Sequence, residues 1–333
     1  MILQSTDPAA IAEAAARLAA GELVAFATET VYVLGADACS EPAVARIFAA
    51  KGRPSDHPLI VHVVDEHAAA YFVREVPPVA RRLMHAFWPG PLTVILPRRE
   101  GVAAAAAGGQ DSVGLRCPSY PAAQALLRAC AAHTPAVHGL AAPSANRFGR
   151  VSPTTADHVR AEFGDALTVL DGGPCPVGIE STIVDCTRGR PVLLRPGVLT
   201  HAQVEVACGE RLWLPHELDQ AGPRASGTLA SHYAPQARVR VMTKAALEAA
   251  VAGRAASGPG PVAIWSRRVC TPFGAQGLHR TLPEDPLVAA RELFAVLRDF
   301  DSQGVRQIWI EQPPDTPEWA GVRDRLQRAA ATD

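Results

Sequence analysis

Hydrophobic and polar positions in the first 200 residues switch repeatedly between helical and strand spacing. Asp7 and Pro8 open a stretch whose apolar residues share one helix face, and Gly21 ends it. The apolar run 23–27 then predicts a buried strand. The same reasoning predicts helices over 41–50, 79–87 and 121–132, strands over 59–64, 92–96, 113–116, 167–170, 181–185 and 192–195, and a loop over 140–153.

The regular pattern weakens between residues 201 and 235, where glycine and proline recur as they do in linkers. Beyond it, strands predicted over 238–242, 262–266 and 307–310 alternate with helices over 244–251, 286–300 and 318–330. This alternation is typical of a small parallel, Rossmann-like α/β domain. No G-x-G-x-x-G follows a strand there, so the sequence gives no support for nucleotide binding in that domain. We therefore predict domains over 1–205 and 237–333, joined by a linker over 206–236.

Composition excludes several classes of protein. At 48% apolar and 20% charged residues the chain is globular, and a net charge of −1 argues against a protein that coats nucleic acid, although a local basic cleft remains compatible with it. No apolar run reaches the roughly 18 residues of a membrane span, and the N-terminus lacks the basic segment of a signal peptide. Seven scattered cysteines without C-x-x-C favour free, non-catalytic thiols in a reducing compartment. We expect a cytoplasmic protein.

Only two of the 32 basic residues are lysines, Lys51 and Lys244. Lys51 precedes Gly52 and Arg53, just before Pro54. An ammonium beside a guanidinium fork could bind phosphate, and the alternative is a solvated helix end whose cations complement the helix dipole.

Further polar clusters interrupt predicted strand ends and loops. Thr28-Glu29-Thr30 follows the first predicted strand and could line a crevice or simply form a turn. Ser144, Asn146 and Ser152 could donate to phosphate or ribose oxygens, or build local turns. Arg116 and Arg195 end strands next to prolines, where each either binds an anion or pairs with a carboxylate.

The sequence also lacks the motifs of several enzyme classes. It contains no Walker A sequence, no H-E-x-x-H, no G-x-S-x-G and no EF-hand loop, which argues against P-loop kinases, zincins and α/β hydrolases. Cations, hydroxyls and histidines without an obvious nucleophile fit catalysis by positioning and charge stabilisation, as in reactions at phosphorus.

Together these clusters resemble the YrdC family, and most closely its long, two-domain threonylcarbamoyl-AMP synthases. The resemblance covers nearly the whole chain and is densest over 22–200. It is carried by Phe26-Ala-Thr-Glu-Thr-Val-Tyr32, Lys51-Gly-Arg53, His57-Pro-Leu-Ile-Val-His62, Trp88-Pro-Gly-Pro-Leu-Thr93, Gly114-Leu-Arg-Cys-Pro118, Ala142-Pro-Ser-Ala-Asn146, Ser152-Pro-Thr154, Gly178-Ile-Glu-Ser-Thr182, Leu194-Arg-Pro-Gly197 and Ser231-His-Tyr-Ala-Pro235.

The resemblance implies a fold, a reaction and partners. The fold is a twisted mixed-sheet α/β domain, a linker that folds over the active site, and a smaller Rossmann-like domain. The reaction is a nucleotidyl transfer in which L-threonine, bicarbonate or CO2 and ATP, with Mg²⁺ bound through the ATP phosphates, give threonylcarbamoyl-adenylate and pyrophosphate. Downstream threonylcarbamoyl-transfer proteins would then place the group on adenosine 37 of tRNA.

Carried over by motif, the resemblance also assigns site residues. Lys51 and Arg53 would be catalytic and neutralise phosphate or carbamate charge. L-Threonine would be bound by Thr30, His62, Arg116, Ala142 and Ser181. ATP would be bound by Lys51, Arg53, His57, Ser112, Ser144, Asn146, Ser152, Arg195 and Tyr233. No protein motif for a metal ion is implied.

Two departures from the family pattern stand out. Val33 replaces a glycine, which would be costly if φ were positive there, and the linker reads Ser226-Gly-Thr-Leu-Ala230 in place of Pro-Gly-Met. Two other functions remain open at this point. One is a carbamoyltransferase relative that handles carbamoyl-adenylate, and the other is a double-stranded-RNA or tRNA-binding module with a vestigial site.

Overall fold

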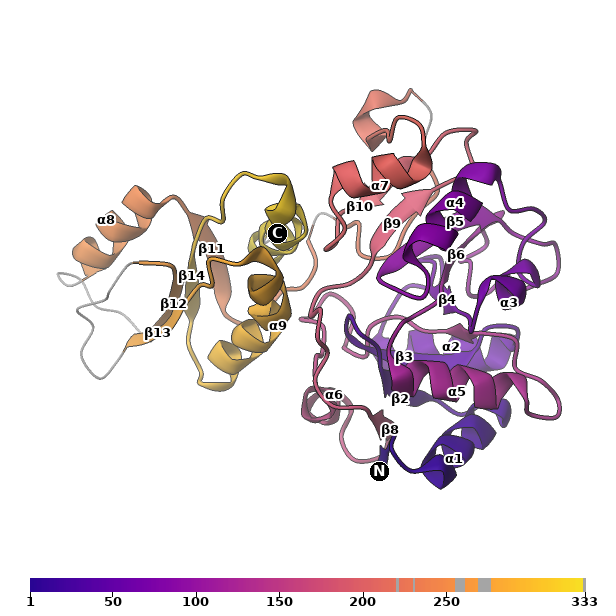
Figure 1. The fold of residues 1–333 in the computed structure, drawn as a ribbon. Coiled ribbons are helices and arrows are strands. Elements are labelled where there is room, and N and C mark those ends of the chain that lie inside the picture. The colour runs from indigo at the N-terminus through magenta and orange to yellow at the C-terminus, as the bar shows by residue number, and fades with distance from the viewer. Residues whose placement is uncertain (220–221, 230, 255–260, 269–276, 332–333) are drawn as a thin grey trace. The chain divides into compact units, whose positions relative to one another are not determined.

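The computed structural model describes residues 1–219, 222–229, 231–254, 261–268 and 277–331 (Figure 1). These residues divide into two compact units. The first unit comprises 1–148 and 152–228, and the second comprises 149–151 and 229–333. The stretch 206–228 thus belongs to the first unit and 229–236 to the second, while a separate linker over 206–236 stays a prediction. Cys270 lies outside the described residues.

The first unit is built around a ten-stranded sheet. Its strands are β1 (Ile2–Gln4), β2 (Val24–Ala27), β3 (Tyr32–Asp37), β4 (Ile60–His62), β5 (Leu92–Pro97), β6 (Ser112–Arg116), β7 (Leu140–Ala141), β8 (Thr168–Asp171), β9 (Thr182–Asp185) and β10 (Val192–Arg195). Its helices are α1 (Pro8–Ala19), α2 (Glu41–Lys51), α3 (Glu66–Ala70), α4 (Pro78–Phe87), α5 (Pro121–Ala131), α6 (Ala156–Phe163), α7 (His201–Cys208) and the 3-10 helix η1 (Pro215–Glu217).

The sheet is mixed, as predicted. The strand order is β1-β8-β2-β3-β7-β4-β6-β5-β9-β10. The sheet contains parallel pairs such as β4/β6 and β5/β9 and antiparallel pairs such as β2/β3 and β5/β6. Strands that are distant in sequence are therefore neighbours in the sheet. The central strands β7, β4, β6, β5 and β9, for example, lie side by side.

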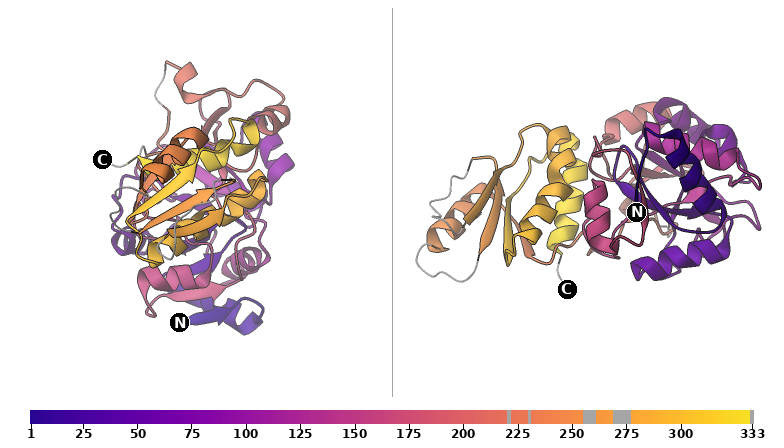
Figure 2. Two further views of the ribbon diagram at one scale, coloured as in Figure 1. Left: turned by 90° about the vertical axis from the view of Figure 1, so that its left-hand side faces the viewer. Right: turned by 90° about the horizontal axis from the view of Figure 1, so that it is seen from below.

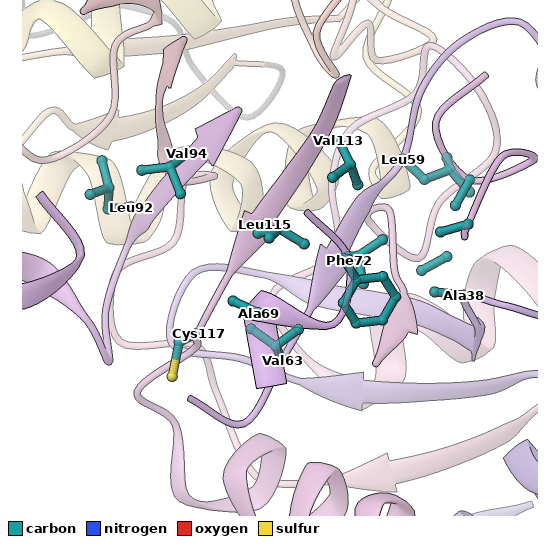
Figure 3. Close-up of a cluster of buried hydrophobic side chains, with 14 of the residues drawn as sticks. Ala38, Leu59, Val63, Ala69, Phe72, Leu92, Val94, Val113, Leu115 and Cys117 are labelled. Carbon is teal, nitrogen blue, oxygen red and sulfur yellow. The ribbon is translucent and has the colours of Figure 1, made fainter. Parts of the chain in front are cut away.

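The two faces of this sheet differ in polarity because side chains alternate along each strand. Leu92, Val94 and Leu96 of β5, with Val113 and Leu115 of β6, all belong to the main hydrophobic core (Figure 3). The intervening positions face the other way. They include Thr93, Ser112, Gly114 and Arg116, so this second face, which we call the site face, carries the polar side chains.

The helix α2 delivers the Lys51-Gly-Arg motif. Ser40 caps its N-terminus through a hydrogen bond from Ala43 N, and Lys51 is its last residue. Gly52 follows with φ +64°, the left-handed conformation in which a side chain is strained. This turn ends the helix and sends Arg53 in a new direction.

Seven elements of the first unit were missed by pattern reasoning, namely β1, β3, β7, α3, α6, α7 and η1. Residues 201–208 form α7 rather than irregular linker, and a reciprocal capping box between Thr200 and Gln203 begins the helix. The apolar pattern misleads there because Val206 is 83% exposed. Within the predicted loop 140–153, Leu140–Ala141 forms β7 between β3 and β4.

The second unit is a small parallel α/β fold, as predicted. Its sheet has the order β11 (Arg238–Met242), β14 (Gln307–Glu311), β12 (Val262–Ser266) and β13 (Gly277–Thr281), all paired in parallel. The helix α8 (Lys244–Arg254) covers one face, and α9 (Pro286–Ser302) and α10 (Ala320–Ala330) cover the other (Figures 1 and 2). The 3-10 helix η2 (Pro317–Trp319) precedes α10. Pattern reasoning did not anticipate β13.

No helix in the described ranges combines the length and apolarity needed to cross a membrane.

Leu115→Ala tests the division of the sheet into two faces. Leu115 is fully buried in the core, so we expect the truncation to lower the free energy of unfolding by about 2–5 kcal/mol, because it removes apolar burial and leaves a cavity. Urea unfolding followed by circular dichroism measures this. Val206→Ala, at the 83% exposed position, should change the free energy by less than about 0.5 kcal/mol, and an equal loss from both variants would contradict the assignment.

Candidate active site

The residues that the motif resemblance assigns to L-threonine come together at the strand ends of the site face. His62 and Arg116 are register partners at the ends of β4 and β6. Ala142 follows β7, and its amide donates to the carbonyl of Ile60 in β4 at 2.9 Å. Ser181 precedes β9, and its Oγ lies 2.7 Å from Thr93 Oγ1 of β5. Neighbouring strands thus bring together four residues that are up to 119 positions apart in sequence.

The fifth residue, Thr30, sits in a rigid turn between β2 and β3. Thr28 Oγ1 donates to the Val31 carbonyl at 2.7 Å and accepts from the amides of Thr30 and Val31 at 3.2 Å each. The Thr30 and Thr28 hydroxyl oxygens are 2.9 Å apart. The carbonyls of Glu29 and Thr30 accept from the amides of Val177 and Gly178. The turn is thereby fixed on both sides, as the turn alternative predicted, while a role in lining a crevice stays a prediction.

Lys51 is buried in spite of its charge, with only 3% of the residue exposed. Its Nζ donates to the carbonyl of Ser144 at 2.6 Å and to the carbonyl of Asn146. Burial, reinforced by the neighbouring Arg53 guanidinium, holds the pKa of Lys51 well below its ordinary value. The lysine is therefore no solvated helix end, because it ties α2 to the loop carrying Ser144 and Asn146.

Arg53 and Arg195 are also buried and share a partner in the chain. Arg53 Nη2 donates to the Pro58 carbonyl at 2.8 Å and to Ser226 Oγ at 3.3 Å. Arg195 Nη1 donates to the Ser226 carbonyl at 2.8 Å. Residues of the 222–228 stretch thus lie against the two guanidiniums expected to bind ATP.

An irregularity in β10 turns Arg195 towards the site. The pairing of β10 with β9 shifts register between Leu193 and Arg195. Leu193 packs in the core, and without the shift Arg195, two residues later, would point the same way. Instead its Nε and Nη2 donate to the carbonyl and Oγ of Ser181 at 3.0 and 3.2 Å. Ser181 therefore joins a threonine-assigned position to an ATP-assigned arginine.

The remaining ATP-assigned residues of the first unit lie around the Lys51 loop and the neighbouring strands. Ser152 is fully buried and donates from Oγ to the carboxylate of Glu180. His57 packs edge-on against Phe148 at 5.4 Å, and its pKa is lowered by burial and by Arg53. Ser112 lines a small pocket together with Gln110, Gly114 and Ser226, among others.

The electrostatics around Arg116 are unusual. Arg116 Nη2 lies 2.8 Å from Glu29 Oε1, and both side chains are at most 5% exposed. His62 beside them is 2% exposed, and burial together with Arg116 lowers its pKa to about 3. His62 is therefore a neutral imidazole at ordinary pH, so Arg116 and Glu29 supply the opposite charges here.

Tyr233 is the one assigned residue that belongs to the second unit. It is buried with a positive φ of +62°, and its ring packs against Phe294 at 5.3 Å and under the Arg325 guanidinium at 5.5 Å. Its contact with ATP stays a prediction.

Sequence reasoning assigned no ligand to three polar side chains that contact the assigned residues in the structure, Glu29, Thr93 and Glu180. Thr93 and Glu180 form hydrogen bonds with assigned serines, and Glu29 pairs with Arg116. Each lies inside a motif that was singled out. The sequence marks each of them only as a polar residue in or beside an otherwise apolar strand. Such a pattern can indicate on which face of the sheet a side chain lies, but it does not identify the residues that the side chain contacts.

Cysteines take no part in this arrangement. The six described cysteines, at positions 39, 117, 130, 175, 186 and 208, are free. Burial raises the pKa of each thiol, to about 11 for Cys39, Cys117 and Cys208. A raised pKa suppresses the reactive thiolate, in line with the expectation of non-catalytic cysteines.

Val33 fits its position without backbone strain. It is a residue of β3, opposite Phe26 on one side and Ser144 on the other. Among described residues other than glycine, positive φ occurs at Ala103 and Tyr233, not at Val33. The conformational cost considered for a valine at this position therefore does not arise.

Comparison with known proteins identifies the family. The family model described as "Telomere recombination", which covers Sua5, YciO and YrdC proteins, matches residues 16–197, and the model of the threonylcarbamoyl-AMP synthase C-terminal domain matches 199–331. The chain is 38% identical over 323 residues to threonylcarbamoyl-AMP synthase of Pyrococcus abyssi, covering 93% of this chain and 91% of the relative. It is 36% identical over 337 residues to the Bacillus subtilis enzyme, covering 98% and 94%.

A solved structure agrees over the same length. The structure of P. abyssi Sua5 complexed with L-threonine matches with a TM-score of 0.88 and 35% identity, covering 99% of this chain and 97% of that one. The two family models and the relatives that match nearly the whole chain thus indicate the same family. This chain belongs to the threonylcarbamoyl-AMP synthase family, in its two-domain Sua5 form.

Proposed function

We propose that this chain joins L-threonine, bicarbonate or CO2, and ATP into threonylcarbamoyl-adenylate, with release of pyrophosphate. The observation that carries the proposal is a set of four buried cations, Lys51, Arg53, Arg116 and Arg195. Arg53 is close enough to Lys51 to lower its pKa, and Arg53 and Arg195 share Ser226 as a partner. Relatives that match nearly the whole chain are named threonylcarbamoyl-AMP synthases. No comparable observation favours carbamoyl transfer or RNA binding with a vestigial site.

Threonine binding rests on Arg116 and its neighbours. A guanidinium can hold a carboxylate through two parallel hydrogen bonds, and a buried site strengthens them. Nε of Arg116 has no hydrogen-bond partner among the described residues, so it is available to a ligand, while Nη2 lies 2.8 Å from Glu29 Oε1. The hydroxyls of Thr30 and Ser181 and the neutral ring of His62 would contact the rest of the amino acid.

The phosphates of ATP would be held by Lys51, Arg53 and Arg195. The threonine amine captures bicarbonate or CO2 as a carbamate, and a carbamate oxygen then attacks the α-phosphorus while pyrophosphate leaves. Preorganised cations stabilise the charge that develops on the phosphate oxygens. An anion beside Lys51 would also favour its ammonium form, which burial alone disfavours.

Mg²⁺ would enter this site with ATP. Within the described ranges, no three His, Cys, Asp or Glu side chains converge in a way that could hold a metal ion. The phosphate oxygens would therefore be its principal ligands, and the ion would neutralise part of their charge.

The 222–228 stretch would act as a cover over the nucleotide. Ser226 already contacts Arg53 and Arg195, and Arg224 is tied to Asp56 at 2.7 Å and to the Gln110 side chain. ATP phosphates would compete with Ser226 for the same guanidiniums. Exclusion of water by such a cover would protect a hydrolysable product.

The product would be passed on within the cytoplasm. Threonylcarbamoyl-adenylate is an activated acyl phosphate, so it needs transfer proteins that consume it before water does. We propose that these proteins place the threonylcarbamoyl group on adenosine 37 of tRNA.

Pyrophosphate release tests the function directly. With ATP and Mg²⁺ present, we expect release to require both L-threonine and bicarbonate, because the carbamate is the nucleophile. A coupled pyrophosphate assay with each component omitted in turn measures this. Release that continues unchanged without threonine would contradict the proposal.

Arg116→Ala should weaken threonine binding selectively. We expect the dissociation constant for L-threonine to rise about 100-fold, because the substrate carboxylate loses its buried cationic partner, while ATP affinity stays within about twofold. Isothermal titration calorimetry with each ligand measures both. Arg160→Ala, at a half-exposed surface position, is the control and should leave both affinities unchanged. If the Arg116→Ala variant lost affinity for ATP and kept its affinity for L-threonine, the assignment of Arg116 to threonine would be wrong.

Lys51→Arg should lower turnover although it keeps the positive charge. The ammonium fits between two carbonyls at hydrogen-bond distance, and the wider guanidinium cannot occupy that space. We expect kcat to fall about 100-fold, comparable to the loss of a preorganised donor. Lys244→Arg alters the chain's other lysine, on the exposed start of α8, and should leave kcat unchanged. Full activity of the first variant would rule out a specific role for the ammonium.

A further inference from the structure

Glu29 is a buried carboxylate with no role in the site described so far. Its side chain is 5% exposed, and its nearest charged partner is Arg116, with Oε1 2.8 Å from Nη2. The contact is close enough for an ion pair, but its angles do not make a hydrogen bond, and neither carboxylate oxygen has a hydrogen-bond partner in the described part of the chain. A buried carboxylate left in this state is costly, which points to a ligand that completes it.

The polar atoms around Glu29 are similarly incomplete. Nδ1 and Nε2 of His62, and Nε and Nη2 of Arg116, also have no hydrogen-bond partner among the described residues. All three side chains are at least nine-tenths buried. The cluster thus offers an anion, a cation and a neutral imidazole at one place, a combination that matches a ligand bearing both a positive and a negative group.

Charge balance decides which groups that ligand must carry. If a substrate carboxylate alone bound to Arg116, two carboxylates would share one guanidinium in a buried site, and their repulsion would weaken binding. A cationic group on the same substrate, placed against Glu29, removes this conflict. An α-amino acid has both groups on adjacent bonds, whereas a hydroxy acid has only the carboxylate.

The position of Glu29 is fixed by backbone contacts. It lies in the turn held by Thr28 Oγ1, and its own carbonyl accepts from the Val177 amide at 2.8 Å. The other ionisable groups that act on it are few. Cys117 and Cys175 lie near, and burial raises the pKa of both thiols, so they stay neutral. Arg116 is then the one charged side chain of the described residues that faces Glu29 at ion-pair distance.

We propose that Glu29 is a further catalytic residue, which binds the α-ammonium group of the substrate amino acid and accepts a proton from it when the carbamate forms. This deepens the proposed function and rests on it. The ammonium and bicarbonate together give a carbamate, one water and one proton. Glu29 first takes one proton from the ammonium, which frees the nitrogen lone pair; that lone pair then forms the N–C bond while the C–OH bond of bicarbonate breaks. Of the two protons that leave nitrogen, one completes the departing water and one goes to Glu29, which returns it to solvent.

The decisive experiment compares two ligands on two proteins. L-Threonine and 2,3-dihydroxybutanoate differ in having an ammonium or a hydroxyl at the α-carbon. We expect wild type to prefer threonine by about 100-fold, and the near-isosteric Glu29→Gln variant to prefer it by less than about tenfold, because a charged hydrogen bond is lost. Isothermal titration calorimetry gives all four affinities. A preference unchanged within twofold would overturn the proposal.

A pH profile tests the proton transfer separately. In Glu29→Gln, turnover should rise with pH between about 7 and 9, because solvent then removes the proton that the carboxylate no longer accepts. Wild type should gain less over that range, and parallel profiles would overturn the catalytic part of the proposal. Glu311→Gln, which alters a buried carboxylate of the second unit, is the matched control and should follow wild type.

The outcomes separate this proposal from the proposed function. The titrations need no turnover, so absence of pyrophosphate release from wild type would reject the function, while the ligand preference would still judge Glu29. Unchanged ATP affinity and circular dichroism show that the variant is folded. If it does not fold, the wild-type titrations alone still decide against the proposal when threonine and the hydroxy acid bind equally.

Discussion

The two-residue alternation of the ten-stranded sheet is the constraint on which the rest of the first unit depends. One face must be apolar to pack against helices such as α2 and α4, which leaves the other face free to carry polar groups. Because the strand order is not sequential, strand ends from distant parts of the chain meet on that free face. The packing of the core on one face of the sheet thus determines which residues are left to form the site on the other face. The one strand whose alternation would misdirect its arginine, β10, shifts register before Arg195.

Burial of charge is the second constraint, and each buried cation is stabilised by hydrogen bonds or an ion pair with residues next to it. Lys51 is held by two backbone carbonyls, Arg195 by Ser181 and Ser226, and Arg116 by Glu29. Backbone carbonyls supply hydrogen bonds without a counter-charge, so several cations can be gathered in one place and still respond to an incoming anion. The near-zero net charge of the chain therefore says nothing about the site, whose positive charge is offset by carboxylates elsewhere.

The arrangement explains how chemistry can proceed without a protein nucleophile. The described cysteines have raised pKa values, and the hydroxyls at the site are engaged in hydrogen bonds such as those of Thr28, Thr93 and Ser152. What remains is a rigid set of charges whose contribution is orientation and electrostatic stabilisation. Within that set Lys51, Arg53 and Arg195 are the cations that we propose bind the phosphates. Arg116 and Glu29, with opposite charges, are the pair that we propose binds the amino acid.

The sequence by itself determined the α/β class, most helices and strands, the parallel second domain and the motifs that mark the family, because hydrophobic period and turn residues are local properties. It also located the clusters around Thr30, Lys51, Arg116 and Ser144. Only the tertiary structure decided their partners. Whether Arg116 pairs with a carboxylate, whether Lys51 is buried and whether Val33 is strained depend on strand order, register and φ. These are set by contacts between residues as far apart as Glu29 and Arg116, which no local pattern encodes.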